Sequence, residues 1–143
     1  MSRVASPDFN TVEAGQELPA REFTPDTIQL FLYNAVLWNA HKIHFDYPYA
    51  TEVEGYPGLV MAGPLLGDWL HQCVVDWLGD NGRLLEIEYS NRRAAYIGDT
   101  LRSVGKIVAV DRERRQVTIE VAILNQNDEV LALGTAVAEF AAP

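Results

Sequence analysis

Cysteine and histidine are scarce in this 143-residue chain, which contains one cysteine and three histidines. A single cysteine, Cys73, cannot form an intrachain disulfide and cannot anchor a cysteine-rich zinc site. Because Cys73 lies within an apolar run, we expect a buried structural thiol in preference to a nucleophile. The chemistry of the chain therefore has to come from other side chains.

Basic residues are also few, since eleven lysines and arginines stand against twenty acidic residues and give a formal charge of −9. This balance argues against nucleic acid or an anionic membrane surface as the main partner. A local basic cluster can still hold a small phosphorylated ligand. The hydrophobic fraction of 48% and the charged fraction of 22% are ordinary for a folded protein. We expect one domain over residues 1–143.

Long apolar runs are absent. The first residues alternate charge, proline and polar groups and build no apolar signal segment. The apolar stretches elsewhere are too short or too charged to span a bilayer. The expectation is a cytoplasmic protein with a loose arm at residues 1–10.

Two segments have the pattern of helices. The first is expected from Thr24 to about Trp38, with Thr24 as the cap, Pro25 at the first position and Asp26 in the first turn. Its apolar residues recur at helical spacing and predict one buried face: Ile28, Phe31, Leu32, Ala35 and Val36. The second helix is predicted from Gly63 to a stop at Gly79. It carries a wide apolar stripe: Leu65, Leu66, Trp69, Leu70, Cys73, Val74, Trp77 and Leu78.

The remaining chain reads as strands. Apolar and polar residues alternate over about 84–90, 100–110, 117–123 and 130–140, with short polar turns between them. This pattern predicts a long antiparallel meander, with one more edge strand near residues 15–19. Strands that follow a dominant apolar helix indicate an α+β protein in which a long antiparallel sheet wraps one central helix, the hot-dog fold. Exposed sheet edges favour pairing of two such domains.

The segment between the two helices holds the chemistry. His44 can accept or donate a proton near neutral pH. Asn39 offers an amide that can orient water or a carbonyl but cannot take up a proton. Gly63 is expected at the N-cap of the second helix, where its amide, and Leu65 or Leu66 after Pro64, favour a developing negative charge. This combination suits reactions through an enolate-like oxyanion.

Two other interpretations of the histidines stay open from the residues alone. A loop histidine can serve only a structural hydrogen bond. His41 and His44 could also bind a metal together with Asp46, Glu52 or Glu54, but the expected third histidine at a suitable spacing is missing. We therefore expect no metal and no cofactor.

Residues 38–46, Trp-Asn-Ala-His-Lys-Ile-His-Phe-Asp, resemble a motif of the MaoC-like acyl-thioester hydratases and dehydratases. The nearest resemblance is to the branch of type 2 hydroxyacyl-thioester dehydratases and mesaconyl-CoA-hydratase-like proteins. It runs from residue 38 to residue 66 and, more loosely, through residues 91–93 and 98–101. In the wider family an aspartate and a histidine five residues later flank the substrate double bond. Here Asn39 stands at the aspartate position and His44 at the histidine position.

The resemblance implies a lyase that adds water to an enoyl thioester or removes it from a 3-hydroxyacyl thioester of CoA or a carrier protein. His44 would be the acid/base and Gly63 the oxyanion donor, with His41 or Glu54 as a second acid/base. The substrate pocket is expected to include Trp38, Tyr56 and Met61, and the CoA phosphates are expected to contact Arg92, Arg93, Arg102 or Lys106.

Relatives in this branch often carry two hot-dog units, so a homodimer or a heteromer with a second hot-dog subunit is expected. Two alternatives follow from the same residues. Loss of the aspartate at Asn39 is compatible with an accessory subunit that binds an acyl thioester without chemistry. A thioesterase would place its carboxylate on the second helix, where Asp68 is the only early candidate.

Overall fold

Helix α2, Gly63–Leu78, forms one layer of the computed structural model, which describes residues 6–143. Pro64 occupies its first turn, and the chain leaves it at Gly79, whose φ of 56° is in the left-handed region that favours glycine. The predicted apolar stripe is buried throughout, including Cys73, whose pKa is raised by its burial. Within residues 6–143 no helix combines the length and apolar character that a membrane span requires. The predicted central helix is confirmed.

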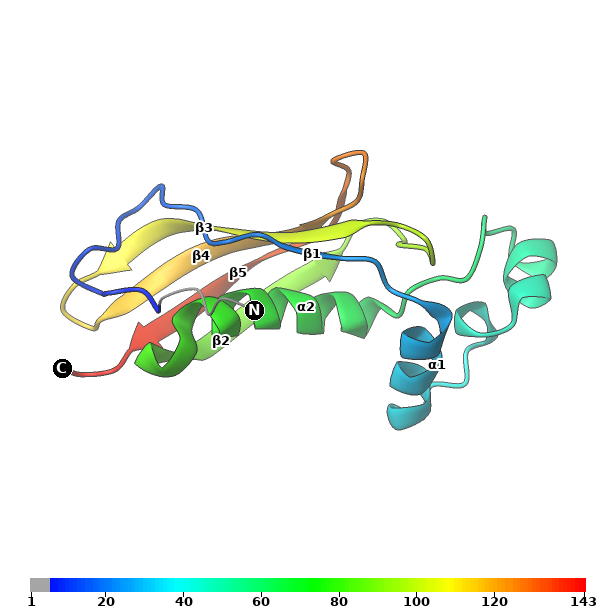
Figure 1. Cartoon of the computed structure of the whole chain (residues 1–143), viewed down its shortest axis with the longest axis horizontal. Helices are drawn as coiled ribbons and strands as arrows, with labels where there is room; N and C mark the ends of the chain where they lie inside the picture. Colours follow the sequence, from blue (N-terminus) through cyan, green and yellow to red (C-terminus); the bar gives the residue numbers. More distant parts are fainter. Residues whose placement is uncertain (1–5) are drawn as a thin grey trace.

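A five-stranded antiparallel sheet forms the second layer and curves over one side of α2 (Figure 1). Its strands, in chain order, are β1 Arg21–Phe23, β2 Gly82–Asn91, β3 Leu101–Asp111, β4 Gln116–Leu124 and β5 Val130–Phe140. Alternate residues of β3 and β4 face the helix and are almost fully buried: Leu101, Ser103, Ile107, Val117, Ile119 and Ile123. The α+β hot-dog architecture expected from the sequence is confirmed.

The strand order β1-β3-β4-β5-β2 corrects the expected meander, which holds only for β3, β4 and β5. β2 pairs with β5 at the far edge, and β1 pairs with β3. Residues 92–100 carry the chain from β2 to β3 across the start of α2, where Met61 N–H donates to Ala95 O and Ile97 N–H donates to Leu59 O. The edge strand expected near residues 15–19 lies slightly later, at Arg21–Phe23, after one bridge between Glu17 and Lys106.

Helix α1, Thr27–Val36, begins later than predicted, because Asp26 rather than Thr24 caps it. The Asp26 carboxylate accepts from Gln29 N–H at 2.7 Å. The buried face predicted for this helix is wrong, since only Leu30 and Asn34 are buried. Most of the apolar residues predicted to be buried are exposed: Ile28 at 69%, Phe31 and Leu32 at 56% and Val36 at 84%. The reason is position, since α1 lies beyond the end of the sheet and of α2, where this chain has no layer to cover it (Figure 1).

The N-terminal arm is held more firmly than expected. Residues 1–5 lie outside the described residues. Phe9, however, is buried, with its ring centroid 5.1 Å from that of Phe140 and with the Arg112 and Arg115 guanidinium groups stacked on it. Arg112 also donates to the carbonyl oxygens of Phe9 and Val12. The prediction of a loose arm is therefore wrong at Phe9.

Gly134 allows β5 and β2 to approach closely, and we expect its replacement by alanine to destabilise the protein. A Cβ at this position would overlap Glu88 O and lie 2.7 Å from the Cα of Tyr89, and neither backbone atom can move away alone. Gly134→Ala should lower the free energy of unfolding by about 1–3 kcal/mol in urea denaturation. Gly58→Ala is the matched control, since no atom lies within 4 Å of a Cβ there. Equal stability of the two variants would contradict this packing.

Candidate active site

The segment between α1 and α2 contains two short helical turns, η1 at Lys42–His44 and η2 at Tyr49–Val53. Its backbone turns back on itself, since Ala50 N–H donates to Asp46 O and Tyr56 N–H donates to Ala50 O. His44 and Ala50 are buried. The expected long loop is therefore a packed excursion that projects beyond the sheet beside α1 (Figure 1).

Asn39 fixes the entry to η1. Its Oδ1 accepts from His41 N–H at 3.1 Å, and its own N–H donates to Asn34 O at 2.9 Å. The side-chain oxygen is thus used by the turn, and the Nδ2 amino group remains to contact a ligand. This group can donate hydrogen bonds but cannot accept a proton.

His44 is the buried titratable group of this segment, with 8% of its surface exposed. Its Nδ1 lies 2.7 Å from Val60 O. Because a carbonyl oxygen only accepts, Nδ1 carries the proton, and Nε2 holds the lone pair of the neutral ring. Burial lowers the pKa of His44 below 6.5, the Val60 hydrogen bond opposes this effect, and nearby His41 adds to it. Neutral His44 is therefore a base with one defined nitrogen.

Of the two groups expected as a second acid or base, His41 is the one placed beside His44. The two ring centroids are 5.8 Å apart, and His41 is exposed. Glu54 is also exposed, but its carboxylate accepts from the Tyr49 hydroxyl at 2.8 Å, which raises the pKa of Tyr49. His41 is thus the better placed of the two expected groups.

Asp68, the carboxylate that a thioesterase would require, lies on α2 and is also engaged. The Tyr33 hydroxyl of α1 donates to it at 2.8 Å. Burial and this hydrogen bond raise the pKa of Tyr33. Asp68 therefore serves to join α1 to α2.

The start of α2 offers fewer donors than the sequence suggested. Ala62 is the N-cap, and Gly63 is the first helical residue. Pro64 has no N–H, and Leu65 N–H donates to Ala62 O at 3.0 Å, so Leu65 does not offer the free donor that was expected. Within residues 6–143 no acceptor is found for Gly63 N–H. Of the amides at residues 63–65, the free one is therefore that of Gly63.

A small cavity of about 250 Å³ opens at this helix start. It brings together five residues named from the sequence: Met61, Gly63, Leu66, Arg92 and Arg93. Arg93 also pairs with Glu129 at 3.4 Å. The cavity adds Asn91, to which the sequence reasoning gave no role. In the sequence, Asn91 stood out only as part of the motif at residues 91–93. Its position beside Gly63 depends on where the fold places the end of β2.

Residues 60–63 connect the histidine segment to the cavity. Val60 accepts from His44 through its carbonyl and donates through its N–H to Ile43 O at 3.0 Å. Val60 and Gly63 are three residues apart, which limits their separation to about 11 Å of extended chain. His44 is therefore anchored to a residue three positions before Gly63, although it does not line the cavity.

Trp38 and Tyr56, expected in the substrate pocket, do not line this cavity. Trp38 is 93% exposed and has a φ of 55°, so its side chain lines no pocket in the single chain. Tyr56 is half-buried, and its ring centroid lies 6.3 Å from that of Tyr96. Of the three expected pocket residues, only Met61 is at the helix start.

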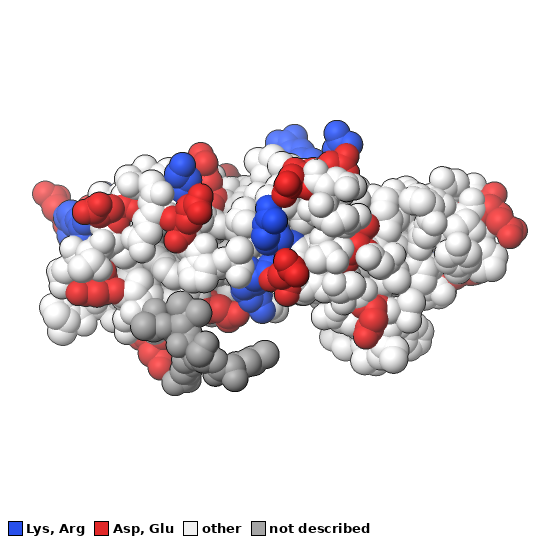
Figure 2. All heavy atoms as spheres, turned by 45° about the horizontal axis from the view of Figure 1, so that its top comes forward, with Lys and Arg blue, Asp and Glu red and all other residues white. Residues whose placement is uncertain are grey.

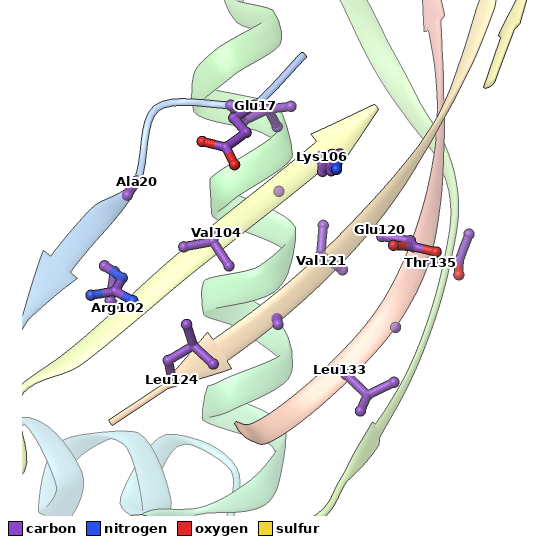
Figure 3. A pocket seen from close by; sticks show the side chains of 14 residues that line it. Glu17, Ala20, Arg102, Val104, Lys106, Glu120, Val121, Leu124, Leu133 and Thr135 are labelled. Atoms are coloured by element: carbon purple, nitrogen blue, oxygen red, sulfur yellow. The ribbon is translucent and has the colours of Figure 1, made fainter. Parts of the chain in front are cut away.

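A hollow of about 780 Å³ lies on the face of the sheet turned away from α2 (Figure 3). Val104, Leu124 and Leu133 form part of its apolar floor, and Arg102 and Lys106 lie along β3. It contains Arg102 and Lys106, two of the expected phosphate contacts, but none of the expected catalytic or substrate-pocket residues, and Arg102 is paired with Asp128 at 2.9 Å. Size alone does not make it the active site.

Comparison with known proteins gives two partial curated relatives and a close match of fold. Mesaconyl-C(4)-CoA hydratase of Chloroflexus aurantiacus is 54% identical over 46 residues, which are 32% of this chain and 16% of the relative. Hydroxyacyl-thioester dehydratase type 2, mitochondrial, of Schizosaccharomyces pombe is 54% identical over 44 residues, 31% of this chain and 15% of the relative. The structure of the (R)-hydratase from A. caviae involved in PHA biosynthesis superposes with a TM-score of 0.84 at 17% identity, covering 92% of this chain and 98% of that one.

These two matches span less than a fifth of each relative. Because 46 residues make up 16% of the Chloroflexus protein, that relative is about twice as long as this chain. The family model described as hydroxyacyl-thioester dehydratase type 2 covers far more of the chain, residues 4–97. The chain therefore belongs to the hydroxyacyl-thioester dehydratase type 2 family.

Proposed function

We propose that the protein is a lyase that adds water to an enoyl thioester, or removes it from a 3-hydroxyacyl thioester, of CoA or an acyl carrier protein. The observation that carries the proposal is the hydrogen bond from His44 Nδ1 to Val60 O, three residues before the free amide of Gly63. Family membership and the hydratase and dehydratase names of the relatives support the reaction type. A cytoplasmic location stays a prediction.

Each step of the proposed reaction has a group in this site. In hydration, His44 Nε2 removes a proton from water as the oxygen adds to C3 of the enoyl thioester. The negative charge that develops on the thioester oxygen is stabilised by Gly63 N–H at the start of α2. Protonated His44 then returns the proton to C2, and dehydration is the reverse. One base thus serves both proton transfers.

Asn39 is proposed to hold the water or the 3-hydroxyl group. Its Oδ1 is engaged by His41 N–H, so the contact to the substrate would come from Nδ2. Donation from Nδ2 leaves a water lone pair free to attack but removes no proton. In this proposal His44 is the single base, and the Asn39 amide positions the water or the 3-hydroxyl group.

Loss of the imidazole should abolish the reaction. His44→Ala is expected to lower kcat for a panel of enoyl thioesters by about 10²- to 10⁴-fold, the usual contribution of a positioned acid/base. Hydration is followed as loss of the absorbance of the conjugated thioester. His71→Ala is the matched control, since this histidine of α2 is exposed and lies outside the proposed site. Wild-type turnover in His44→Ala would overturn the assignment of His44.

The pH dependence of the hydration rate tests whether the imidazole ring of His44 is buried. Hydration needs neutral Nε2, and burial lowers the pKa of His44 from 6.5, so the neutral base persists below that pH. The rate kcat/KM for hydration should therefore stay high at pH 7 and fall only as pH drops through a value below 6.5. The profile is measured from pH 4.5 to 8 with the thermal unfolding temperature as a stability control. A fall in kcat/KM with its midpoint above pH 6.5 would contradict the burial of His44.

Restoring a carboxylate tests whether the chain is a competent enzyme or an accessory subunit. In Asn39→Asp one oxygen can keep the bond to His41 N–H, and the other is free to act as a base. For a wild type that is itself active, we expect kcat to change by about tenfold or less, because His44 already supplies the base. A wild type that is inert alone while Asn39→Asp turns over substrate would favour the accessory reading.

We further propose that a second hot-dog domain covers the exposed side of α1. The apolar residues of this helix continue into Leu37 and Trp38, which are 49% and 93% exposed and lead directly into Asn39. Figure 2 shows that the surface at this end of the molecule is largely uncharged in that view. Exposed apolar patches of this kind mark association surfaces. A relative twice as long has room for a second domain of this kind.

Charged substitutions on α1 should weaken this association. Phe31→Glu with Val36→Lys places two charges on the exposed face without touching buried Leu30. Light scattering after size exclusion should show the wild type as a dimer, alone or with a co-encoded hot-dog subunit, and the double variant as a monomer. Val108→Lys, at an exposed apolar residue of β3, serves as control. A monomeric wild type under both conditions would refute the proposed partner.

A further inference from the structure

Asn91 lies directly against the start of α2. A Cβ placed on Gly63 would be 2.5 Å from Asn91 Nδ2 and 3.5 Å from its Cγ. The carboxamide therefore occupies the space next to the Gly63 Cα, and both residues line the same 250 Å³ cavity. Asn91, at the end of β2, is thus in contact with Gly63, the first residue of α2.

The contact is made at the Cα of Gly63. Its φ is not in the left-handed region, so the backbone conformation does not require glycine there. A side chain at residue 63 would require the exposed Asn91 amide to shift from its present position. With glycine at residue 63, the Asn91 carboxamide can lie against the first residue of α2.

The backbone of Asn91 is well anchored, whereas its side chain is free. Asn91 is the last residue of β2 and is paired with Ala132 of β5. The next two residues, Arg92 and Arg93, both donate their N–H groups to Leu131 O, at 2.7 and 3.2 Å. In the described part of the chain, no hydrogen bond is made by the Asn91 carboxamide. The backbone thus positions Asn91, and the two N–H donors of its exposed side chain are available to a ligand.

The helix start has a shortage of donors that Asn91 can relieve. Pro64 has none and Leu65 N–H is used by Ala62 O, which leaves Gly63 N–H for an oxyanion. Oxyanion sites are commonly built from a backbone N–H together with a second donor, and asparagine side chains serve in this role. The amide of Asn91 is the side-chain donor that contacts Gly63.

We propose that Asn91 Nδ2 donates a hydrogen bond to the thioester carbonyl oxygen alongside Gly63 N–H, so that a β2 side chain completes the oxyanion site. The proposal rests on the thioester hydratase or dehydratase function proposed above. It adds an asparagine to the site and assigns it to the carbonyl, while Asn39 serves the water or hydroxyl. The two asparagines therefore act at opposite ends of the reacting group.

Substitutions at Asn91 distinguish a role in hydrogen-bond donation from a role in packing. Asn91→Ala removes both donors, and kcat should fall by about 10²-fold with a much smaller change in KM, as for loss of one oxyanion donor. Asn91→Asp keeps the shape but places an acceptor and a negative charge near the oxyanion, so its kcat should be lower still. Ser90→Ala, the preceding exposed residue of β2, is the control and should keep wild-type kcat. Equal, small effects of Asn91→Ala and Asn91→Asp would overturn the proposal.

The carbonyl stretching frequency gives a readout that does not depend on turnover. In the His44→Ala background, an enoyl-CoA labelled with ¹³C at the thioester carbonyl is bound and its infrared band is recorded. A donor at the oxygen lowers the frequency, so adding Asn91→Ala should shift the band back toward its value in solution. An unchanged band, with the thioester still bound, would overturn the role of Asn91 alone. Absence of thioester binding and turnover by the wild type would overturn the proposed function and Asn91 with it.

Discussion

The hydrogen bond between His44 Nδ1 and Val60 O is the constraint on which the rest of the site depends. It joins an excursion that lies beyond the sheet to the residues that lead into the central helix. It also fixes the tautomer, because the carbonyl can only accept and Nε2 is left as the base. Burial then keeps the ring neutral by lowering its pKa. One contact of 2.7 Å thus sets the place, the orientation and the protonation of the group proposed to carry the reaction.

The helix start acts as the second half of the proposed site because several backbone features converge on it. The link from β2 to β3 crosses this point and bonds to residues 59–61, while β2 ends at Asn91 beside Gly63. The helix dipole and the free amide favour negative charge there. This strand order places the end of β2 beside the start of α2.

Much of this could be predicted from the sequence. The apolar stripe of α2, the strand alternation of β3 to β5 and the compact motif of residues 38–46 are local patterns, and the family model confirms the resemblance drawn from that motif. The prediction from the sequence was wrong where the burial of a helix depends on which other elements lie against it. The apolar pattern of α1 predicted a buried face, yet Phe31 and Val36 are exposed because the chain has no layer beyond the end of its sheet. Helical periodicity shows which residues share one face of α1, but not whether another layer lies over that face.

The sequence by itself determined the two-layer fold, the central helix and the residue types capable of proton transfer, because these depend on side-chain chemistry and on repeats of two or 3.6 residues. Only the tertiary structure decided that Leu65 N–H is already used, that Trp38 lies in solvent and that Asn91 meets Gly63. Asn91 and Gly63 are 28 positions apart in the sequence, and no local pattern encodes their contact. It exists because β2 ends at the sheet edge that faces the beginning of α2.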